Sequence, residues 1–260
     1  MDLGLAGKRA LVLSSSRGLG GAVAASLVAE GAQVFMTARS KEKLEAAASA
    51  LSVKGPGKAI AFAADLKTEA KQIFEAANAA LGGIDILVAN TGGPPAKTAL
   101  DAEASDFAAH FEAMIVPVIA IAKLALPGMR AQKWGRIVTI ASSGVQQPIP
   151  NLVISNALRS SLVGWSKTLA AEVAAEGITV NMVLPGRIET DRTAELDAAN
   201  AQRQGKSVEE VAKAAVATIP AGRYGRPQEF ADVVTFLASE RAGYVTGSLV
   251  RVDGGAVRGI

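Results

Sequence analysis

The chain of 260 residues contains no cysteine and only one histidine, His110. Disulfides, thiolate nucleophiles and cysteine-ligated zinc are therefore excluded, and a single histidine cannot form a multi-histidine metal site. Aromatic residues are also scarce, with 7 Phe, 2 Trp and 2 Tyr, so few side chains are available to stack on nucleic-acid bases. We predict neither a metal site nor a nucleic-acid partner.

Charge of one sign and long hydrophobic runs are scarce as well. The 27 Lys and Arg nearly balance the 24 Asp and Glu, which leaves a net charge of +3 without a basic block. The longest apolar stretch, 113–122, contains Pro117 and ends at Lys123, well short of the roughly 20 residues that span a bilayer. Asp2 and Gly4 interrupt the segment in which a secretory signal would be apolar. These absences predict a cytoplasmic protein without a membrane span.

Apolar residues make up half of the chain, enough for a large core. Short β-branched runs alternate with longer Ala-rich amphipathic stretches, which is typical of repeated strand-helix units around a buried parallel sheet. We predict a single α/β domain over 1–260, a doubly wound (Rossmann) parallel sheet of about seven strands with helices on both faces. The predicted strands are 9–13, 33–37, 58–63, 84–89, 135–140, 178–184 and 248–252, and the helices are 18–30, 41–51, 68–81, 105–132, 153–176 and 227–239.

The polar segment 191–207 follows Pro185-Gly186 and precedes a short amphipathic stretch. We expect it to form a mobile flap over the carboxyl ends of the strands, where loops of such sheets line the ligand site.

The first predicted strand leads directly into a turn rich in small residues, and a helical pattern begins at once. Small residues let the backbone approach a phosphate, and the start of a helix supplies free N–H groups and a positive dipole end. This pattern favours a phosphate-binding turn, although a tight turn without a ligand has the same composition. The turn reads Leu13-Ser14-Ser15-Ser16-Arg17-Gly18-Leu19-Gly20.

Arg39 lies nineteen residues beyond Gly20, at the end of the second predicted strand. A fold that prefers NAD places Asp or Glu there to bind the ribose, whereas a guanidinium can bind the 2′-phosphate of NADP. Arg17 can stack on the adenine or add a second positive charge. The sequence therefore favours NADP(H), and the alternative is that both arginines are merely solvated.

Further motifs extend along the whole chain, and with them it resembles the short-chain dehydrogenase/reductase family, in particular its 3-oxoacyl-carrier-protein reductases. The resemblance rests on the turn above and on Asp65-Leu66, Asn90-Thr91-Gly92, the run from Trp134 to Val138, Asn181, the run from Pro185 to Thr190, the run from Gly222 to Pro227, Val245-Thr246-Gly247 and the run from Val252 to Gly255.

The resemblance implies roles for many of these residues. Asp65 would bind the adenine amine and Asn90 would brace the central strand. The implied cofactor-binding set is Ser14, Ser16, Arg17, Gly18, Leu19, Gly20, Arg39, Asp65, Leu66, Asn90 and Gly92, with Pro185, Ile188 and Thr190 at the nicotinamide end. The resemblance also implies a small carbonyl or alcohol substrate, and a homotetramer or homodimer packed through the helices that start near Ser105 and Val153.

Two regions depart from the family pattern. The family usually has Thr-Gly where this chain has Leu13-Ser14, and Ser is disfavoured if that position needs a positive φ. The family's catalytic residues are an Asn, a Ser, and a Tyr four residues before a Lys. Alignment of the flanking residues matches Ser142 to the catalytic Ser but places Met114, Ser155 and Arg159 at the other three positions.

These replacements change the proton chemistry. A phenol can be tuned toward neutrality by a nearby cation, whereas the hydroxyl of Ser155 is a far weaker acid on a shorter side chain. Arg159 keeps a positive charge but does not relay a proton at ordinary pH. His110, four residues before Met114, is either a substitute acid or a packing residue. Tyr224 and Tyr244 lie too far along the chain to replace the missing phenol.

The sequence predicts an NADP(H)-dependent oxidoreductase with an atypical proton donor. Ser142 would polarise the substrate carbonyl, Arg159 would stabilise oxyanion charge, and solvent would supply the proton. The alternative is a homologue that binds the nucleotide without catalysis and serves as a regulatory protein or subunit.

Overall fold

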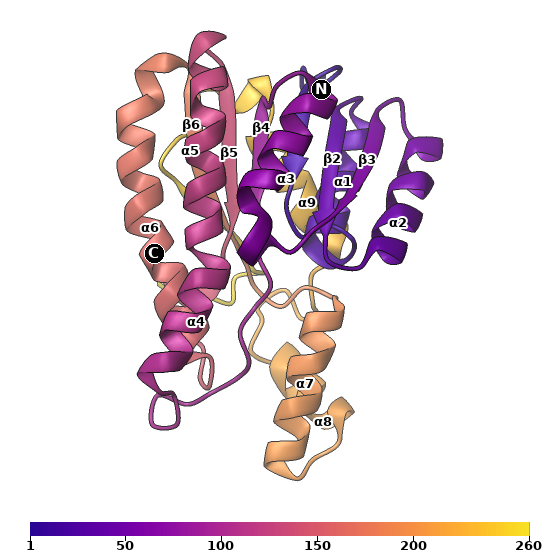
Figure 1. Ribbon diagram of the computed structural model, residues 1–260. Coiled ribbons are helices and arrows are strands. Elements are labelled where there is room, and N and C mark those ends of the chain that lie inside the picture. The colour runs from indigo at the N-terminus through magenta and orange to yellow at the C-terminus, as the bar shows by residue number, and fades with distance from the viewer. Residues whose placement is uncertain (260) are drawn as a thin grey trace.

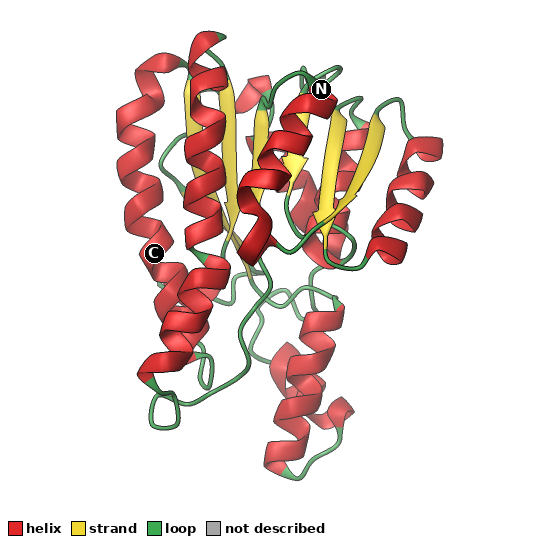
Figure 2. Cartoon of the chain, in the orientation of Figure 1, coloured by secondary structure: helices red, strands yellow, loops and turns green. Residues whose placement is uncertain are grey.

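Seven parallel strands form one sheet in the order β3-β2-β1-β4-β5-β6-β7, in a computed structural model that describes residues 1–259 (Figures 1 and 2). The order reverses between β1 and β4, which both pair with their neighbours in parallel register. The doubly wound sheet predicted from the sequence is confirmed, with each strand within two residues of its predicted bounds. The strands are β1 (Arg9–Val12), β2 (Gln33–Ala38), β3 (Lys58–Ala63), β4 (Ile86–Ala89), β5 (Gly135–Ile140), β6 (Ile178–Pro185) and β7 (Leu249–Val252).

Helices cover both faces of the sheet, so the central strands are buried on both sides and are mostly apolar (Figure 1). The buried side chains form two clusters, one on each face. Ile73, Ile121 and Leu162 belong to the first cluster, and Val23 and Phe230 belong to the second. The first face carries α3 (Leu66–Leu81), α5 (Val116–Ala131) and α6 (Val153–Val173), and the second carries α1 (Gly18–Ala29), α2 (Lys41–Lys54) and α9 (Pro227–Leu237).

The single long helix predicted over 105–132 is wrong, because the structure divides it into α4 (Ala104–Met114) and α5. The break falls at Ile115, which has φ −104° and ψ −54°. Pro117 explains the break, since it has no N–H to donate to the preceding turn and its ring crowds the backbone before it.

By length and composition alone, the stretch Ala104–Ala131 is long and apolar enough to cross a membrane. Val118, Ile121 and Met129 of this stretch are at most 1% exposed and belong to the cluster that packs on the sheet. Core helices of globular proteins pass the same test, so the stretch is not evidence for a membrane span.

The segment 191–207 is not the loose flap expected from its polarity. It forms α7 (Asp191–Gln204), which is followed by α8 (Val208–Val216), and both lie beyond the carboxyl ends of the strands (Figure 1). The side chain of the buried Asp197 anchors α7, because it accepts hydrogen bonds from the Arg187 guanidinium and from the Tyr224 hydroxyl, the latter at 2.8 Å. The predicted position over the strand ends is correct. The segment is helical rather than loose because its helix-forming residues and the Asp197 anchor count for more than its polar composition.

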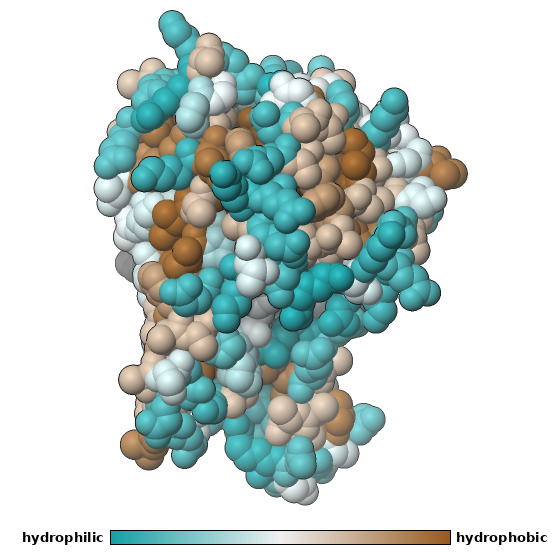
Figure 3. Space-filling view, in the orientation of Figure 1, coloured by the Kyte–Doolittle hydropathy of each residue, from teal (hydrophilic) through white to brown (hydrophobic). Residues whose placement is uncertain are grey.

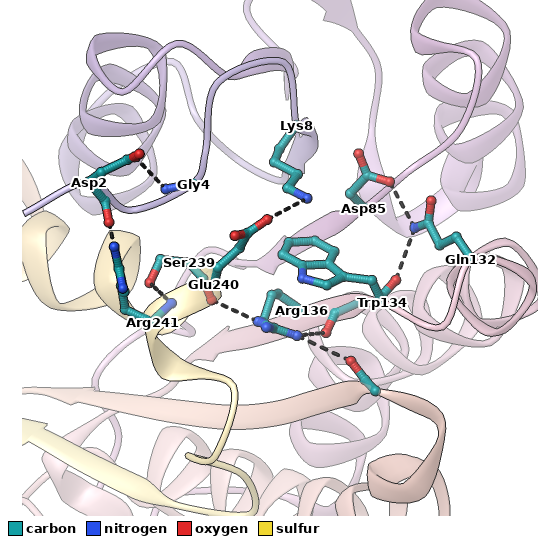
Figure 4. A network of polar contacts seen from close by, with 12 residues as sticks. Asp2, Gly4, Lys8, Asp85, Gln132, Trp134, Arg136, Ser239, Glu240 and Arg241 are labelled. Carbon is teal, nitrogen blue, oxygen red and sulfur yellow. Dashed lines mark hydrogen bonds and ion pairs between the residues drawn. The ribbon is translucent and has the colours of Figure 1, made fainter.

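A polar network lies at the amino ends of β1, β4 and β5, at the end of the sheet opposite to α7 and α8 (Figure 4). Trp134 lies between two cations, with the Lys8 ammonium 4.1 Å and the Arg136 guanidinium 4.3 Å from its ring centroid. Nearby, the largely buried Asp85 carboxylate accepts hydrogen bonds from the Arg9 guanidinium and from the Gln132 amide. Burial acts to raise the pKa of Asp85, but these hydrogen bonds outweigh it and hold that pKa below its ordinary value.

We expect Asp85→Asn to lower the free energy of unfolding by about 1 to 3 kcal/mol, because it removes a charge-assisted partner of Arg9. The contribution of Asp85 is fully present above its ordinary pKa of about 4 and is lost as the pH falls through its lower folded-state pKa. Urea unfolding should therefore show a smaller difference in the free energy of unfolding between the parent and Asp85→Asn at pH 3 than at pH 7. The exposed Glu112→Gln is the control, and an equal loss in both variants would contradict the assignment.

Candidate functional site

A cleft of about 1190 Å³ opens at the carboxyl ends of the strands and extends to α7. It is lined by the loops that follow β1 through β6, as expected for a doubly wound sheet. All of the predicted site residues line this cleft except Gly20. Gly20 lies behind the turn, where a Cβ atom would come 2.5 Å from the Ser14 carbonyl oxygen and 2.7 Å from the Asn90 amide nitrogen. Its function is therefore close packing.

The turn after β1 has the geometry of an anion site. The first turn of α1 contains no acidic residue, and no side chain caps its N-terminus, so the backbone N–H groups there point toward the cleft with the positive end of the helix dipole. Ser15 fixes the turn from behind, because its hydroxyl donates to the Val12 carbonyl at 2.9 Å and accepts from the Thr37 N–H at 3.2 Å. This arrangement can hold a phosphate.

Ser14 has φ +50°, so this position does adopt the positive φ that would disfavour serine. Residues other than glycine are strained in this region of backbone space, because their Cβ atom crowds the backbone. The Ser14 carbonyl accepts a hydrogen bond from the Asn90 side-chain amide at 3.1 Å, which ties the turn to the loop after β4. This bond helps to hold Ser14 in its unfavourable conformation.

The two arginines at the predicted nucleotide end differ in their partners. Arg39 is exposed just beyond β2 and forms no ion pair within residues 1–259. Arg17 instead pairs with Asp191 at the start of α7, with 2.5 Å between Nη1 and Oδ2. Both partners are more than half exposed, so this pair is weak and can open for a ligand. Asp65 caps α3 at the same end of the cleft by accepting from the Lys67 N–H.

The predicted catalytic residues meet at the other end of the cleft, where Ser142, Ser155 and Arg159 all line it. The Ser142 oxygen accepts from the Gly144 N–H at 3.1 Å, which leaves its hydroxyl hydrogen free to donate to a ligand. Arg159 is only 8% exposed, and burial together with the nearby positive charge of Arg192 lowers the pKa of its guanidinium to about 10. It therefore stays charged at pH 7.

Met114 and His110 lie on α4 and both line this end of the cleft. Met114 is 3% exposed and offers no hydrogen bond, as the sequence indicated. No tyrosine lines the cleft in the described part of the chain, because Tyr224 bonds to Asp197 and Tyr244 is fully exposed. Residues 1–259 also hold no group of three or more His, Asp or Glu side chains that could bind a metal ion.

Arg192 is the residue that sequence reasoning missed. Its Nη2 donates to the Pro94 carbonyl at 2.6 Å, which brings the guanidinium of α7 to the loop after β4. Only the helical fold of 191–204 places it there, and no local pattern distinguishes it from Arg187 or Arg203.

Comparison with known proteins identifies the family. Residues 13–257 match a family model described as Enoyl-(Acyl carrier protein) reductase. The chain is 38% identical over 251 residues to the 3-oxoacyl-(acyl-carrier-protein) reductase FabG of Escherichia coli K12, covering 96% of this chain and 97% of that protein. The chain belongs to the short-chain dehydrogenase/reductase family. The resemblance that its motifs carried is thereby confirmed.

Solved structures of this family have the same fold. The L-sorbose reductase of Gluconobacter frateurii, determined in complex with NADPH and L-sorbose, superposes with a TM-score of 0.94 at 32% identity, with both chains fully covered. YwfH, an NADPH-dependent reductase involved in bacilysin biosynthesis, superposes with a TM-score of 0.92 at 28% identity, covering 97% of this short-chain dehydrogenase/reductase and 100% of YwfH.

We expect Ser14→Gly to raise the free energy of unfolding by about 0.5 to 1 kcal/mol, because glycine adopts a positive φ without the clash of a Cβ atom. Thermal and urea unfolding will measure the change. Ser40→Gly is the matched control, since Ser40 has φ −82° and gains nothing from glycine. If both variants are destabilised, the strain assigned to Ser14 is absent.

Proposed function

We propose that this short-chain dehydrogenase/reductase is a single-domain NADP(H)-dependent oxidoreductase that acts on a small carbonyl or alcohol. The observation that carries the proposal is the continuous cleft that joins the turn at α1 to Ser142 and Arg159. One end offers helix N–H groups for phosphates, and the other offers a hydroxyl donor beside a buried positive charge. A volume of about 1190 Å³ is large enough for a dinucleotide together with a small substrate.

The preference for the phosphorylated nucleotide follows from the residues beside the turn. Arg39 supplies an exposed, uncommitted guanidinium where a carboxylate would repel a 2′-phosphate. Arg17 supplies a second one when its exposed pair with Asp191 opens. NADPH in the L-sorbose reductase structure and in the description of YwfH supports the same choice. Asp65 and Leu66 are proposed to hold the adenine, and Pro185, Ile188 and Thr190 the nicotinamide end.

The nicotinamide, when bound, supplies or accepts the hydride. Ser142 then donates a hydrogen bond to the reacting oxygen, since its hydroxyl hydrogen has no acceptor among the residues that the structure describes. Arg159 stabilises the negative charge that develops on that oxygen, and it acts through its charge rather than by giving up a proton. Solvent supplies the proton, because Ser155 is too weak an acid and Met114 makes no hydrogen bond to a water chain.

One observation favours a second candidate function. Without a tyrosine in the cleft, a positioned acid is missing, and its loss lowers a rate by about 10²- to 10⁴-fold. A protein that binds NADP(H) and serves as a regulatory protein or a silent subunit would tolerate this loss.

The surface of α4 and α5 supports a homodimer or homotetramer. Phe111, Val116 and Leu124 are large hydrophobic side chains that are 37% to 41% exposed, and hydrophobic side chains gather over these helices in Figure 3. We propose that copies of the chain pack through these helices and α6.

The cofactor proposal predicts tight binding of NADPH and weak binding of NADH by the protein without substrate. Arg39→Gln should weaken NADPH binding about ten- to hundred-fold and leave NADH unchanged, because only the 2′-phosphate contact is removed. Calorimetric or fluorescence titration will measure both dissociation constants, with the exposed Lys54→Gln as the charge-matched control. If neither nucleotide binds at millimolar concentration, the oxidoreductase proposal fails and a structural or binding role takes its place.

The catalytic proposal predicts that Ser142→Ala lowers the rate of NADPH oxidation by about 10²-fold in a screen of carbonyl substrates. The double change Ser155→Tyr with Arg159→Lys should raise it, because it restores a positioned acid beside a cation. A parent that binds NADPH but is inactive, beside an active double variant, would instead support the silent homologue. Each variant is first checked for unchanged NADPH affinity.

A further inference from the structure

Within residues 1–259, the buried Arg159 forms no ion pair with an acidic side chain. Its Nη1 donates to the Ile140 carbonyl at 3.0 Å, and its Nη2 approaches the carbonyls of Thr91 and Gly92 at 3.4 and 3.5 Å. Neutral carbonyls orient the guanidinium but do not neutralise it. Burial of a charge without a counter-charge is costly, so this end of the cleft favours an anion that the protein itself does not supply.

A second guanidinium lies along the same loop. Arg192 donates to the Pro94 carbonyl, and a Cβ atom on Gly93 would come within 3.3 Å of its Nε and Nη2 atoms. Gly93 therefore leaves the space in which this guanidinium rests. Arg159 and Arg192 thus contact opposite ends of the loop 91–94, and the charge of Arg192 is close enough to depress the pKa of Arg159.

The other charged groups that line the cleft do not cancel this pair. Glu195 is 3.5 Å from Arg192 but more than half exposed, so it is a weak partner that an incoming anion can replace. Asp191 pairs with Arg17 at the nucleotide end. Arg187 is paired with Asp197, and Arg258 adds a further positive charge to the lining.

We propose, building on the oxidoreductase function above, that the substrate is an oxo acid or the corresponding hydroxy acid whose carboxylate is held between Arg159 and Arg192. Arg159 bonds to the carbonyl of Ile140, two residues before Ser142, so the carboxylate lies next to the carbonyl that Ser142 polarises. This proximity favours 2-oxo and 3-oxo acids, in which one or two bonds separate the carboxyl carbon from the reacting carbon. Guanidinium groups match carboxylates in geometry as well as charge.

The test compares acids with their esters. The protein, alone and saturated with NADP⁺, is titrated by calorimetry with 2-oxobutanoate, 3-oxobutanoate, phenylpyruvate and the methyl ester of each. We expect at least one acid to bind ten-fold or more tightly than its ester. Arg192→Gln should reduce that ratio to within two-fold without changing the NADP⁺ dissociation constant, and the exposed Lys213→Gln on α8 should retain it. Arg192 is suited to this test because it is partly exposed, so its replacement leaves the core intact.

Two results of the binding titrations would overturn the proposal. Esters that bind as tightly as their acids in all three pairs would show that the guanidinium pair selects no carboxylate. Weaker NADP⁺ binding by Arg192→Gln would show that the pair serves the cofactor instead. Turnover is measured separately: equal NADPH oxidation with acids and esters contradicts only the carboxylate site, whereas acid binding without any oxidation contradicts only the proposed catalysis.

Discussion

The hydrogen bond from the Asn90 amide to the Ser14 carbonyl joins the two loops between which the cleft opens. These loops follow β1 and β4, the neighbouring strands at which the order of the sheet reverses. Connections leave in opposite directions at such a reversal, so a crevice forms there unless something bridges it. The Asn90 bond bridges it at its base and keeps the helix start of α1 and the loop 91–94 in one fixed relation. The turn after β1 and the end of the cleft beside Ser142 therefore belong to one continuous cleft.

Positive charge dominates this site from one end to the other. The dipole of α1 and Arg39 place positive charge at the end of the cleft beside the turn after β1, and Arg159 and Arg192 place positive charge at the end beside Ser142. The charges differ in how they are held. Arg39 is exposed and free to follow a ligand, whereas three backbone carbonyls orient Arg159 before any ligand arrives. A preorganised charge in a dry site stabilises a developing oxyanion more than a mobile one.

Most of the fold was predictable because local and long-range signals agree. Buried parallel strands need continuous β-branched runs, and helices such as α3 and α9 carry a clear apolar face. The errors fall where one residue or one long-range contact decides the outcome. Pro117 breaks a helix whose apolar pattern runs on without interruption, and the polar segment after Thr190 becomes α7 because Asp197 reaches Arg187 and Tyr224. Such a contact has no signature in the segment itself.

The site shows the same division. Residues in or beside the turn could be found because small residues, the strand before them and the helix after them act together. The sequence raised a positive φ at Ser14 only as a condition, and the structure shows that the condition holds. Arg192 could not be found from the sequence, because its position beside the loop 91–94 depends on the course of α7. Family comparison locates the positions where a proton donor is expected. The geometry adds that no tyrosine within residues 1–259 lines the cleft, whereas His110 does line it.

The absence of the phenol and the uncompensated charge of Arg159 are connected. A cation beside a phenol serves to lower the pKa of that phenol, and when Ser155 stands at the phenol's position the cation no longer has that partner. Burial of the Arg159 guanidinium costs free energy. A negative charge in the bound state would offset that cost. A substrate carboxylate or a developing oxyanion supplies that charge, and a neutral ligand does not. In the reaction proposed above, the proton comes from water that reaches the cleft, so the rate of the chemical step would depend on solvent access rather than on a single titrating side chain.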